Sequence, residues 1–395
     1  MALSNIRSDF PVLRNNPELV YLDSGATSLK PQSVVDEMMW FLTEGTSAVY
    51  RGVHQLGVES TERFTEARET IANWFGVSSD QLIFTSGTTA AINLVRYGLQ
   101  DLKNVVTTNA EHHSNLLPWR QGLDCRVIDC DSSGRITGEI LDAELNNMPA
   151  DLVAISHVGN VLGAMQPIRE LGEVARSHGS LMLVDAAQSA AHLDCDLDAL
   201  GADFLVCSGH KMLGPSGIGA LVAQPEALQR LGPVSWGGGM VESVKADVHE
   251  LQQPPQRWEA GSPNVEAALG WAAAIDYLES LERPNLHRHL QTITAAAQEQ
   301  LSNVSGVELL GECSPAGQNG ILPIKIDGWE AHAAARVLSQ RFNICVRSGF
   351  HCAQPLHQAL DWAPTLRASF HVYTTLDDIE RFTTAVETLT KLKVG

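Results

Sequence analysis

A lysine and an aspartate follow two apolar, strand-like stretches of this sequence. The stretch 181–184 ends in Asp185, and the stretch 204–207 leads shortly to Lys211. Taken singly, Asp185 would be an ordinary strand-end residue and Lys211 a solvated surface lysine. Together they suit pyridoxal phosphate, because a lysine amine can form a Schiff base and a carboxylate can keep a pyridine nitrogen protonated. The pair therefore predicts amino-acid chemistry at Cα.

Hydroxyl and imidazole side chains near other strand ends could complete a cofactor site. Thr88 and Thr89 follow one expected strand and open a helix, where amides and hydroxyls suit a phosphate. A simple N-cap role is the alternative for a threonine there. Ser208 and His210 beside the lysine could supply further donors. His112 could stack on a cofactor ring, although a solvated loop histidine fits the sequence equally well.

A second reactive segment, residues 347–355, carries a cysteine. Its Gly, Ser and Pro content predicts a loop, in which Cys352 would be accessible and Arg347 and His351 would favour its thiolate. The cysteines at 125, 130, 195, 207 and 345 lie in or beside apolar runs, which predicts inert thiols. Arg367 lies inside an apolar strand and needs an anion. A substrate carboxylate would satisfy it, as would a buried Asp or Glu.

Composition excludes several classes of protein. The chain has 395 residues and a net charge of −19, which argues against nucleic acid or an anionic membrane as partner. We find no signal peptide and no apolar run of about 18 residues, so no membrane helix is expected. Seven scattered cysteines, including one at 313, suggest neither disulfides nor a zinc site. We expect a cytoplasmic protein without a bound metal.

The pattern of apolar runs predicts an α/β fold. We expect strands at 81–85, 104–108, 125–128, 152–156, 181–185, 204–208 and 218–223, with helices at 88–99 and near 115–122 among those between them. Near-continuous apolar strands separated by helices predict a mostly parallel sheet covered on both faces. Ligands bind at the carboxyl ends of such strands, where the lysine and aspartate are expected.

The pattern changes after residue 263. We expect helices at 265–281, 286–301, 329–341 and 376–392, with a break near Pro284, and strands at 307–310, 321–326, 344–347 and 366–370. This α+β order predicts a smaller second domain. We therefore expect a large cofactor-binding domain at 15–263 and a small domain made of 1–14 and 264–395, which carries the cysteine loop.

These residues lie in motifs that closely resemble the SufS/CsdA-type (group II) cysteine desulfurases, in the class V aminotransferase family. The motifs are EHHSN at 111–115, VDAAQ at 184–188, SGHKMLGPSGIG at 208–219, WGGGM at 236–240, EAGSPN at 259–264, RSGFHCAQPL at 347–356 and LRASF at 366–370. The last two look closer to the CsdA subgroup. The resemblance implies a fold-type I pyridoxal phosphate enzyme with a mostly parallel seven-stranded sheet and a smaller α+β domain.

The resemblance also implies a role for each candidate residue. Lys211 would bind the cofactor and move the Cα proton, His112 would act as a further catalytic acid or base, and Cys352 would take the substrate sulfur as a persulfide, leaving alanine. The cofactor would be held at its phosphate by Thr88, Thr89, Ser208 and His210, at its ring by His112, Asp185 and Gln188, and from the other subunit of a homodimer by Ser262. The substrate L-cysteine would be bound by Asn160, Arg347 and Arg367. A SufE/CsdE-like protein would accept the sulfur.

Some positions depart from the family pattern. Tyr50 stands where a histidine is usual, and Phe350 stands where relatives have His or Gln. Further departures are Gly25, Ala90 and the segment 371–375. Selenocysteine lyase, or another class V enzyme such as an aminotransferase, is the alternative function. Cys352 argues against an aminotransferase, which needs no loop thiol, but it does not exclude selenocysteine cleavage.

Overall fold

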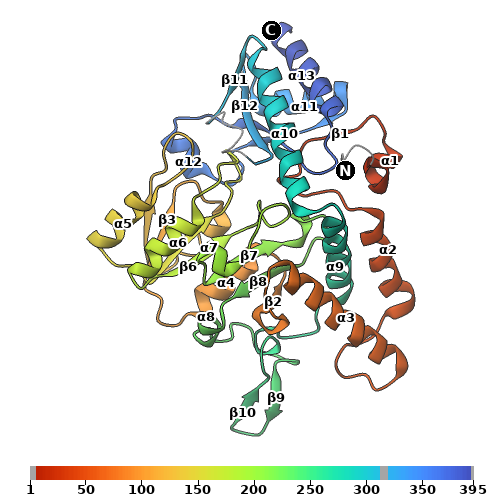
Figure 1. Ribbon diagram of the computed structural model, residues 1–395, viewed down its shortest axis with the longest axis vertical. Helices are drawn as coiled ribbons and strands as arrows, with labels where there is room; N and C mark the ends of the chain where they lie inside the picture. The colour runs from red at the N-terminus through yellow and green to blue at the C-terminus, as the bar shows by residue number, and fades with distance from the viewer. Residues whose placement is uncertain (1–5, 312–318, 393–395) are drawn as a thin grey trace.

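The structure is a computed structural model that describes residues 6–311 and 319–392; the cysteine at 313 lies outside them. Its larger sheet has seven strands in the order β2-β8-β7-β6-β5-β3-β4 (Figure 1). The strands are β2 (Leu82–Thr85), β3 (Asn104–Thr108), β4 (Asp124–Ile128), β5 (Leu152–Ser156), β6 (Leu181–Asp185), β7 (Phe204–Ser208) and β8 (Gly219–Ala223). Only β8 runs antiparallel to its neighbours. The mostly parallel seven-stranded sheet is confirmed.

Both faces of this sheet are buried. Along β6, Met182 and Val184 belong to one apolar core and Leu183 to another, as side-chain alternation in a strand requires. The first core includes residues of α2 (Gln32–Trp40), α3 (Gln55–Trp74), α5 (Gly138–Asn147), α6 (Ile168–Ser177), α7 (Leu197–Leu200) and α9 (Val265–Ser280); the second includes residues of α4 (Thr88–Gly98) and α8 (Pro225–Gln229). The uninterrupted apolar strands of the sequence follow from this double cover.

A smaller antiparallel sheet forms the top of the molecule in Figure 1. Its strands are β11 (Val307–Leu309), β12 (Ile321–Ile326), β15 (Thr365–Ser369) and β14 (Arg347–Gly349), and its core is shared with α10 (Arg283–Ser302), α11 (Ala331–Phe342) and α13 (Leu376–Lys391). The remaining elements are α1 (Pro11–Asn15), α12 (Gln354–Ala359), β1 (Val20–Tyr21) paired with β13 (Ile344–Cys345), and the projecting hairpin β9 (Val241–Val244) and β10 (His249–Leu251).

The apolar cores show which segments pack together. All of the core residues of α9 belong to the core of the large sheet, whereas Val20 and Leu22 belong to that of the small sheet. Within α10, Leu286 lies in the larger core and Leu290 in the smaller one. Judged by side-chain packing, the chain therefore leaves the larger core and enters the smaller one within α10. The division into 15–263 and 1–14 plus 264–395 stays a prediction.

Two local predictions are wrong. The expected helix near 115–122 is a short 3-10 turn, His113–Asn115, followed by irregular turns. The expected strand 344–347 is two short strands in different sheets, and β14 takes up the start of the expected loop 347–355. Both segments border the functional site described below, where side-chain contacts outweigh periodicity.

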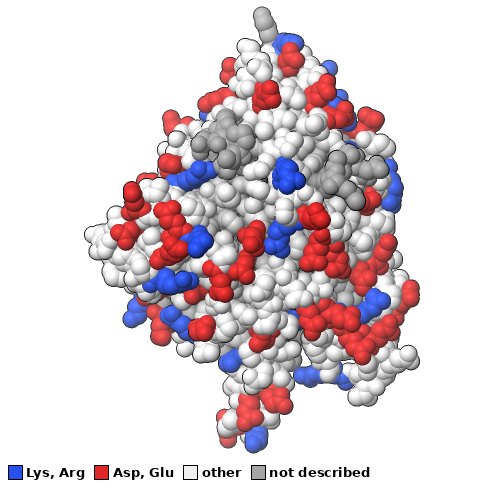
Figure 2. All heavy atoms as spheres, viewed as in Figure 1, with Lys and Arg blue, Asp and Glu red and all other residues white. Residues whose placement is uncertain are grey.

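The surface is mainly acidic, as the net charge of −19 requires. Figure 2 shows Asp and Glu side chains over much of the visible face, with Lys and Arg scattered among them. Within 6–311 and 319–392, no helix combines the length and apolarity needed to cross a bilayer. The same ranges contain no cluster of three or more His, Cys, Asp or Glu residues suited to a metal ion.

Candidate active site

A cavity of about 170 Å³ lies at the carboxyl ends of β5, β6 and β7. Parallel strands place their following loops at one edge, which is why residues far apart in sequence meet there. Of the candidate residues, the cavity is lined by Thr88, Thr89, His112, Asn160, Asp185, Gln188, Ser208, His210, Lys211, Arg347 and Arg367. Lining residues that the sequence analysis missed are Gly25, Ala26, Ser114, Ser156, Val158 and Ala187.

The central pair is a half-buried lysine, Lys211, and a buried carboxylate, Asp185. Burial lowers the pKa of Lys211 to about 8, against the opposing effect of the Asp185 charge. Burial likewise raises the pKa of Asp185, opposed by the Ala187 backbone N–H, which donates to Oδ1 over 2.9 Å, and by Lys211. A lysine with a lowered pKa has more of its amine unprotonated at neutral pH, and so is a better nucleophile and base.

The backbone carbonyls of His210 and Lys211 are held by residues that are distant in sequence. The carbonyl of His210 accepts hydrogen bonds from the Ser28 backbone N–H (2.8 Å) and hydroxyl (2.9 Å). The carbonyl of Lys211 lies 3.3 Å from Nε2 of His371. Because the Val372 N–H donates to His371 Nδ1, the ring carries its proton on Nε2 and donates to Lys211. His371, one of the departures from the family pattern, therefore contacts the lysine directly.

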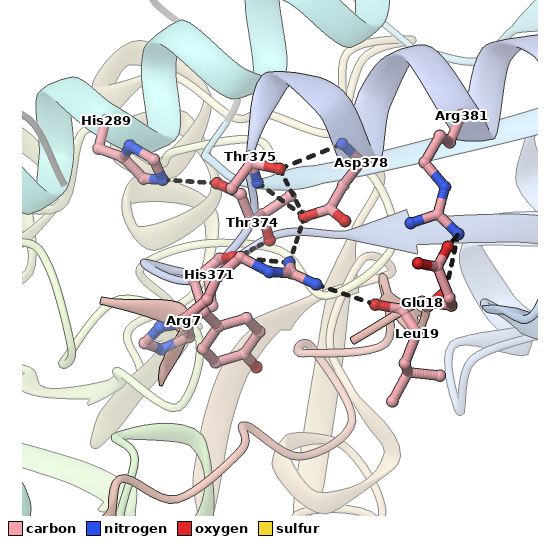
Figure 3. A network of polar contacts seen from close by, with 10 residues as sticks. Arg7, Glu18, Leu19, His289, His371, Thr374, Thr375, Asp378 and Arg381 are labelled. Carbon is pink, nitrogen blue, oxygen red and sulfur yellow. Dashed lines mark hydrogen bonds and ion pairs between the residues drawn. The ribbon is translucent and has the colours of Figure 1, made fainter. Parts of the chain in front are cut away.

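The turn that carries His371 is anchored to both ends of the chain (Figure 3). Thr375 and Asp378 form a capping box at the start of α13, and Arg7 pairs with Asp378 over 2.6 Å. Arg7 also donates to the Tyr373 carbonyl, and His289 bonds to the Thr374 carbonyl. Through Arg7 the N-terminal segment thus contacts the start of α13 and fixes this turn.

A set of hydroxyls and amides surrounds the start of α4. The N-cap residue, Gly87, has no side chain to cap the helix, and the Thr88 N–H donates to Ser208 Oγ over 2.8 Å. The hydroxyl pairs Thr88–Ser208 and Thr89–Ser114 are each 2.7 Å apart. At Gly87, φ is +143° and a Cβ would lie 3.2 Å from Ser208 Oγ. These donors at a helix N-terminus suit a phosphate.

The imidazole of His112 is neutral. Its Nδ1 accepts the Ser114 N–H over 3.1 Å, and burial, then the charge of Lys211, lowers its pKa to about 3. The preceding Glu111 fixes this turn, because its buried carboxylate accepts hydrogen bonds from Asn115 Nδ2 and from the Ser156 N–H on β5. Glu111 lies in the EHHSN motif, but no role was predicted for it; an acidic residue three positions after an apolar strand was the available signal.

Two arginines face each other across the small sheet. Arg347 on β14 and Arg367 on β15 are register partners, and both line the cavity. Like charges opposite each other are unfavourable unless an anion lies between them. Arg367 is 1% exposed, donates to the Asn160 carbonyl (2.7 Å) and pairs with Asp23 over 3.3 Å. The ion-pair interpretation of Arg367 is therefore confirmed, with Asp23 as the acidic partner. Because Arg367 also lines the cavity, a role toward a substrate carboxylate stays a prediction.

The cysteine lies on a tight turn beside the cavity. Both His351 and Cys352 have positive φ, +51° and +60°. The Cys352 carbonyl accepts the His113 N–H (2.8 Å), and the His351 carbonyl accepts Asn160 Nδ2 (2.7 Å). The half-buried Cys352 does not line the cavity itself, but its negative charge as a thiolate would raise the pKa of both Lys211 and Arg367.

The prediction that His351 favours the thiolate of Cys352 is wrong. Burial, then Arg367, lowers the pKa of His351 to about 2, so the ring is neutral and supplies no positive charge to Cys352. Its Nε2 contacts the Thr365 hydroxyl over 2.9 Å instead. Among the other cysteines of the described ranges, burial raises the thiol pKa of every one: Cys125, Cys130, Cys195, Cys207 and Cys345. This agrees with inert thiols there.

Two candidates lie elsewhere or contact other partners. Ser262 does not line this cavity; it borders a separate one of about 550 Å³, together with Tyr50. Within one chain nothing connects it to the site, so its role across a dimer stays a prediction. Gln188 lines the site, and its Nε2 donates to the Gly25 carbonyl over 2.9 Å.

Comparison with known proteins agrees with this arrangement. The aminotransferase class-V family matches residues 20–382. A probable cysteine desulfurase of Mycobacterium leprae is 40% identical over 97% of this chain and 96% of its own, and one of Halalkalibacterium halodurans is 39% identical over 98% of both. The structure of a cysteine desulfurase from Thermococcus onnurineus superposes with a TM-score of 0.93 at 36% identity, over 98% of both chains.

The cysteine desulfurase CsdA of Escherichia coli, in its S-sulfonic acid form, has a TM-score of 0.87 and 30% identity, over 99% of both chains. NifS-like proteins at 22% identity share the fold. The predicted family and fold class are confirmed. The chain belongs to the class-V aminotransferase family, within which its relatives are proteins named cysteine desulfurase.

Proposed function

We propose that this protein is a pyridoxal phosphate-dependent cysteine desulfurase, which converts L-cysteine to L-alanine and leaves the sulfur on Cys352. The observation that carries the proposal is that the Lys211–Asp185 pair lines a cavity and that the Cys352 turn lies directly beside it, bonded to Asn160 of the cavity wall. Relatives named cysteine desulfurase over nearly the full length support it. An aminotransferase would need no such thiol.

The residues of the cavity fit the cofactor. Uncapped amides at the start of α4, with the hydroxyls of Thr88, Thr89 and Ser208, suit its phosphate, and His210 lines the same cavity. The buried carboxylate of Asp185 suits a protonated ring nitrogen, Gln188 lies beside it, and neutral His112 suits a stacked ring. When bound, pyridoxal phosphate stabilises negative charge at the substrate Cα.

Residues of the chain then bind the substrate, move the proton and take the sulfur. Arg367, Arg347 and Asn160 bind and orient the substrate carboxylate, and Lys211 moves the proton at Cα. The Cys352 thiolate attacks the substrate sulfur: the new Sγ–S bond forms, the Cβ–S bond breaks, and a proton takes the place of sulfur on Cβ. One L-cysteine and one thiol thus become one L-alanine and one persulfide.

The proposal also covers the sulfur acceptor, the oligomeric state and the location of the protein. A SufE/CsdE-like acceptor takes the sulfur from the half-buried Cys352, and the protein works as a homodimer in which Ser262 completes the partner's phosphate site. We place it in the cytoplasm, where its thiols stay reduced.

The test measures products from the cofactor-loaded protein. With L-cysteine we expect alanine and protein-bound sulfur in equal amounts, and Cys352→Ala should form neither while still binding cofactor. The matched control is Cys125→Ala, a cysteine on β4 away from the cavity. Full alanine formation by Cys352→Ala with L-selenocysteine but not with L-cysteine would favour a selenocysteine lyase. Transfer of the amino group to a 2-oxo acid would contradict the proposal.

A further inference from the structure

A second, much smaller cavity lies directly behind the catalytic lysine. Its volume is about 20 Å³, and it shares Gly25, Ala187, Gln188 and Lys211 with the active-site cavity. The remaining lining residues are Ser24, Ala191, His192, Leu290, Asn319, Gly320, Ile321, Ser369, Phe370 and His371. We call it the rear cavity. It lies where the end of β6, the turn before β12 and the turn after β15 meet.

The rear cavity is lined by polar atoms that lack partners. Among the described residues, Nε2 of His192 and both Nδ2 and Oδ1 of Asn319 have no hydrogen-bond partner. These side chains are only 6% and 3% exposed. A buried polar group without a partner loses its hydrogen bonds to water and gains none in exchange, so native proteins rarely leave one unpaired. Two such side chains around one cavity indicate a ligand there.

The volume limits what that ligand can be. A cavity needs about 10–15 Å³ to hold one water, and a buried water typically makes about three hydrogen bonds to otherwise unpaired polar groups. The rear cavity meets both conditions, at about 20 Å³ with three unpaired atoms. An amino acid or a phosphate is far too large. Burial keeps the His192 ring neutral by lowering its pKa, so its nitrogen suits a neutral partner.

The walls hold these atoms in place. The Asn319 backbone N–H donates to the Gly163 carbonyl over 3.0 Å, and the Gly320 N–H donates to Thr294 over 3.2 Å. The Gly320 carbonyl in turn accepts the Phe370 N–H over 2.7 Å. On the opposite side, His371 is fixed by the turn drawn in Figure 3. Because this backbone is anchored, Asn319 stays at the wall of the rear cavity.

We propose that the rear cavity is a binding site for a single ordered water molecule, held between the Asn319 amide and His192 Nε2. The water accepts a hydrogen bond from Asn319 Nδ2 and donates one to His192. Because Lys211 also lines the rear cavity, the lysine has a fixed solvent molecule near it. The water site does not rest on the proposed reaction, because neither of its ligands lines the active-site cavity.

The sign of a stability change separates a hydrated rear cavity from a dry one. Asn319→Leu keeps the number and branching of the side-chain heavy atoms and removes both unpaired amide atoms. If a water is bound, the substitution leaves it with too few partners, and the unfolding midpoint should fall by roughly 1–3 °C. If the cavity is dry, removing an unpaired buried amide should leave the midpoint unchanged or raise it, which would overturn the proposal. The exposed Asn146→Leu is the matched control.

A double-mutant cycle and a structure complete the test. Because one water serves both side chains, Asn319→Leu combined with His192→Phe should lower the midpoint by less than the sum of the two single changes. Strictly additive changes would contradict a shared water. A high-resolution crystal structure of the unsubstituted protein should show one water within hydrogen-bonding distance of Asn319 and His192. An empty rear cavity there would overturn the proposal even if the variants fail to fold.

Discussion

The two reactive side chains of this protein are held in different ways. Lys211 follows a central strand of the large sheet, is half-buried like Cys352, and has its carboxylate partner, the buried Asp185, at the end of the neighbouring strand. Cys352 lies on a turn next to the small sheet, half-buried, in a backbone conformation that L-residues rarely adopt. Lys211 is positioned by the large sheet, whereas Cys352 is positioned by hydrogen bonds that the carbonyls of its own turn accept.

This difference suits the two tasks that we propose for these side chains. A group that moves protons at Cα must stay within hydrogen-bond reach of one atom, and a buried strand end gives that precision. A thiol that first takes sulfur and then gives it to another protein must remain accessible from outside. The turn supplies access, and its bonds to His113 and Asn160 keep it beside the cavity.

The largest expected effect is on the lysine side. Lys211→Ala should lower the rate of alanine formation by at least about 10³-fold, because it removes the proton-moving group. The absorption band of lysine-bound cofactor should also disappear. Lys245→Ala, on the projecting hairpin, is the control and should behave as the unsubstituted protein does. A Lys211→Ala protein with near-normal turnover would show that another amine does the work.

Substitution of Arg367 should have the next largest effect. Arg367→Lys keeps the charge but loses the planar pair of donors, so the KM for L-cysteine should rise about 10- to 100-fold, the worth of a hydrogen bond to a charged group. Steady-state kinetics would measure it. If KM stays constant while the unfolding midpoint drops, Arg367 serves only its ion pair with Asp23.

How these residues converge was only partly predictable. The strands that end in Asp185 and Ser208 were evident because apolar runs of that length must be buried, and the motifs identified the lysine and cysteine segments. The expected helix near 115–122 failed because the bonds of Glu111 and Asn115 hold that segment as a turn. Such a turn depends on contacts with β5, which periodicity does not reveal.

The electrostatics of the cysteine turn were not predictable either. His351 stands next to Cys352 in sequence, which suggested a charged neighbour, but its side chain is buried against Thr365. Asp23, the partner of Arg367, is more than 300 residues away in sequence. Neither burial nor such a long-range pair can be read from one sequence, so both required the fold.

The buried imidazole of the cysteine turn makes a pH prediction. The pKa of His351 is about 2 in the folded protein against an ordinary value near 6.5, so the unfolded chain binds the extra proton as the pH falls below 6.5. Because of this group, the free energy of unfolding should decrease by about 2 kcal/mol as the pH falls from 6.5 to 5. His351→Gln should weaken that acid-dependent loss in denaturant unfolding. Equal pH slopes for the two proteins would show that His351 is accessible in the folded state.

The smallest effect concerns the contact to the lysine backbone. His371→Ala removes the hydrogen bond to the Lys211 carbonyl, which is worth about 0.5–1.5 kcal/mol. We expect kcat to fall by up to about tenfold with KM nearly unchanged, together with a shifted absorption band of bound cofactor. His371→Gln, which keeps a donor, should recover part of the loss. If Gln does no better than Ala, the imidazole acts only by filling space.

The most direct test of the whole account is to locate the sulfur. After the cofactor-loaded protein is mixed with L-cysteine and its thiols are blocked, mass spectrometry of its peptides should find one added sulfur atom on Cys352 and on no other cysteine. Cys352→Ser should carry none. Sulfur on a different cysteine, or alanine formed at full rate with no sulfur on Cys352, would contradict the claim that this thiol and Lys211 act on the same substrate.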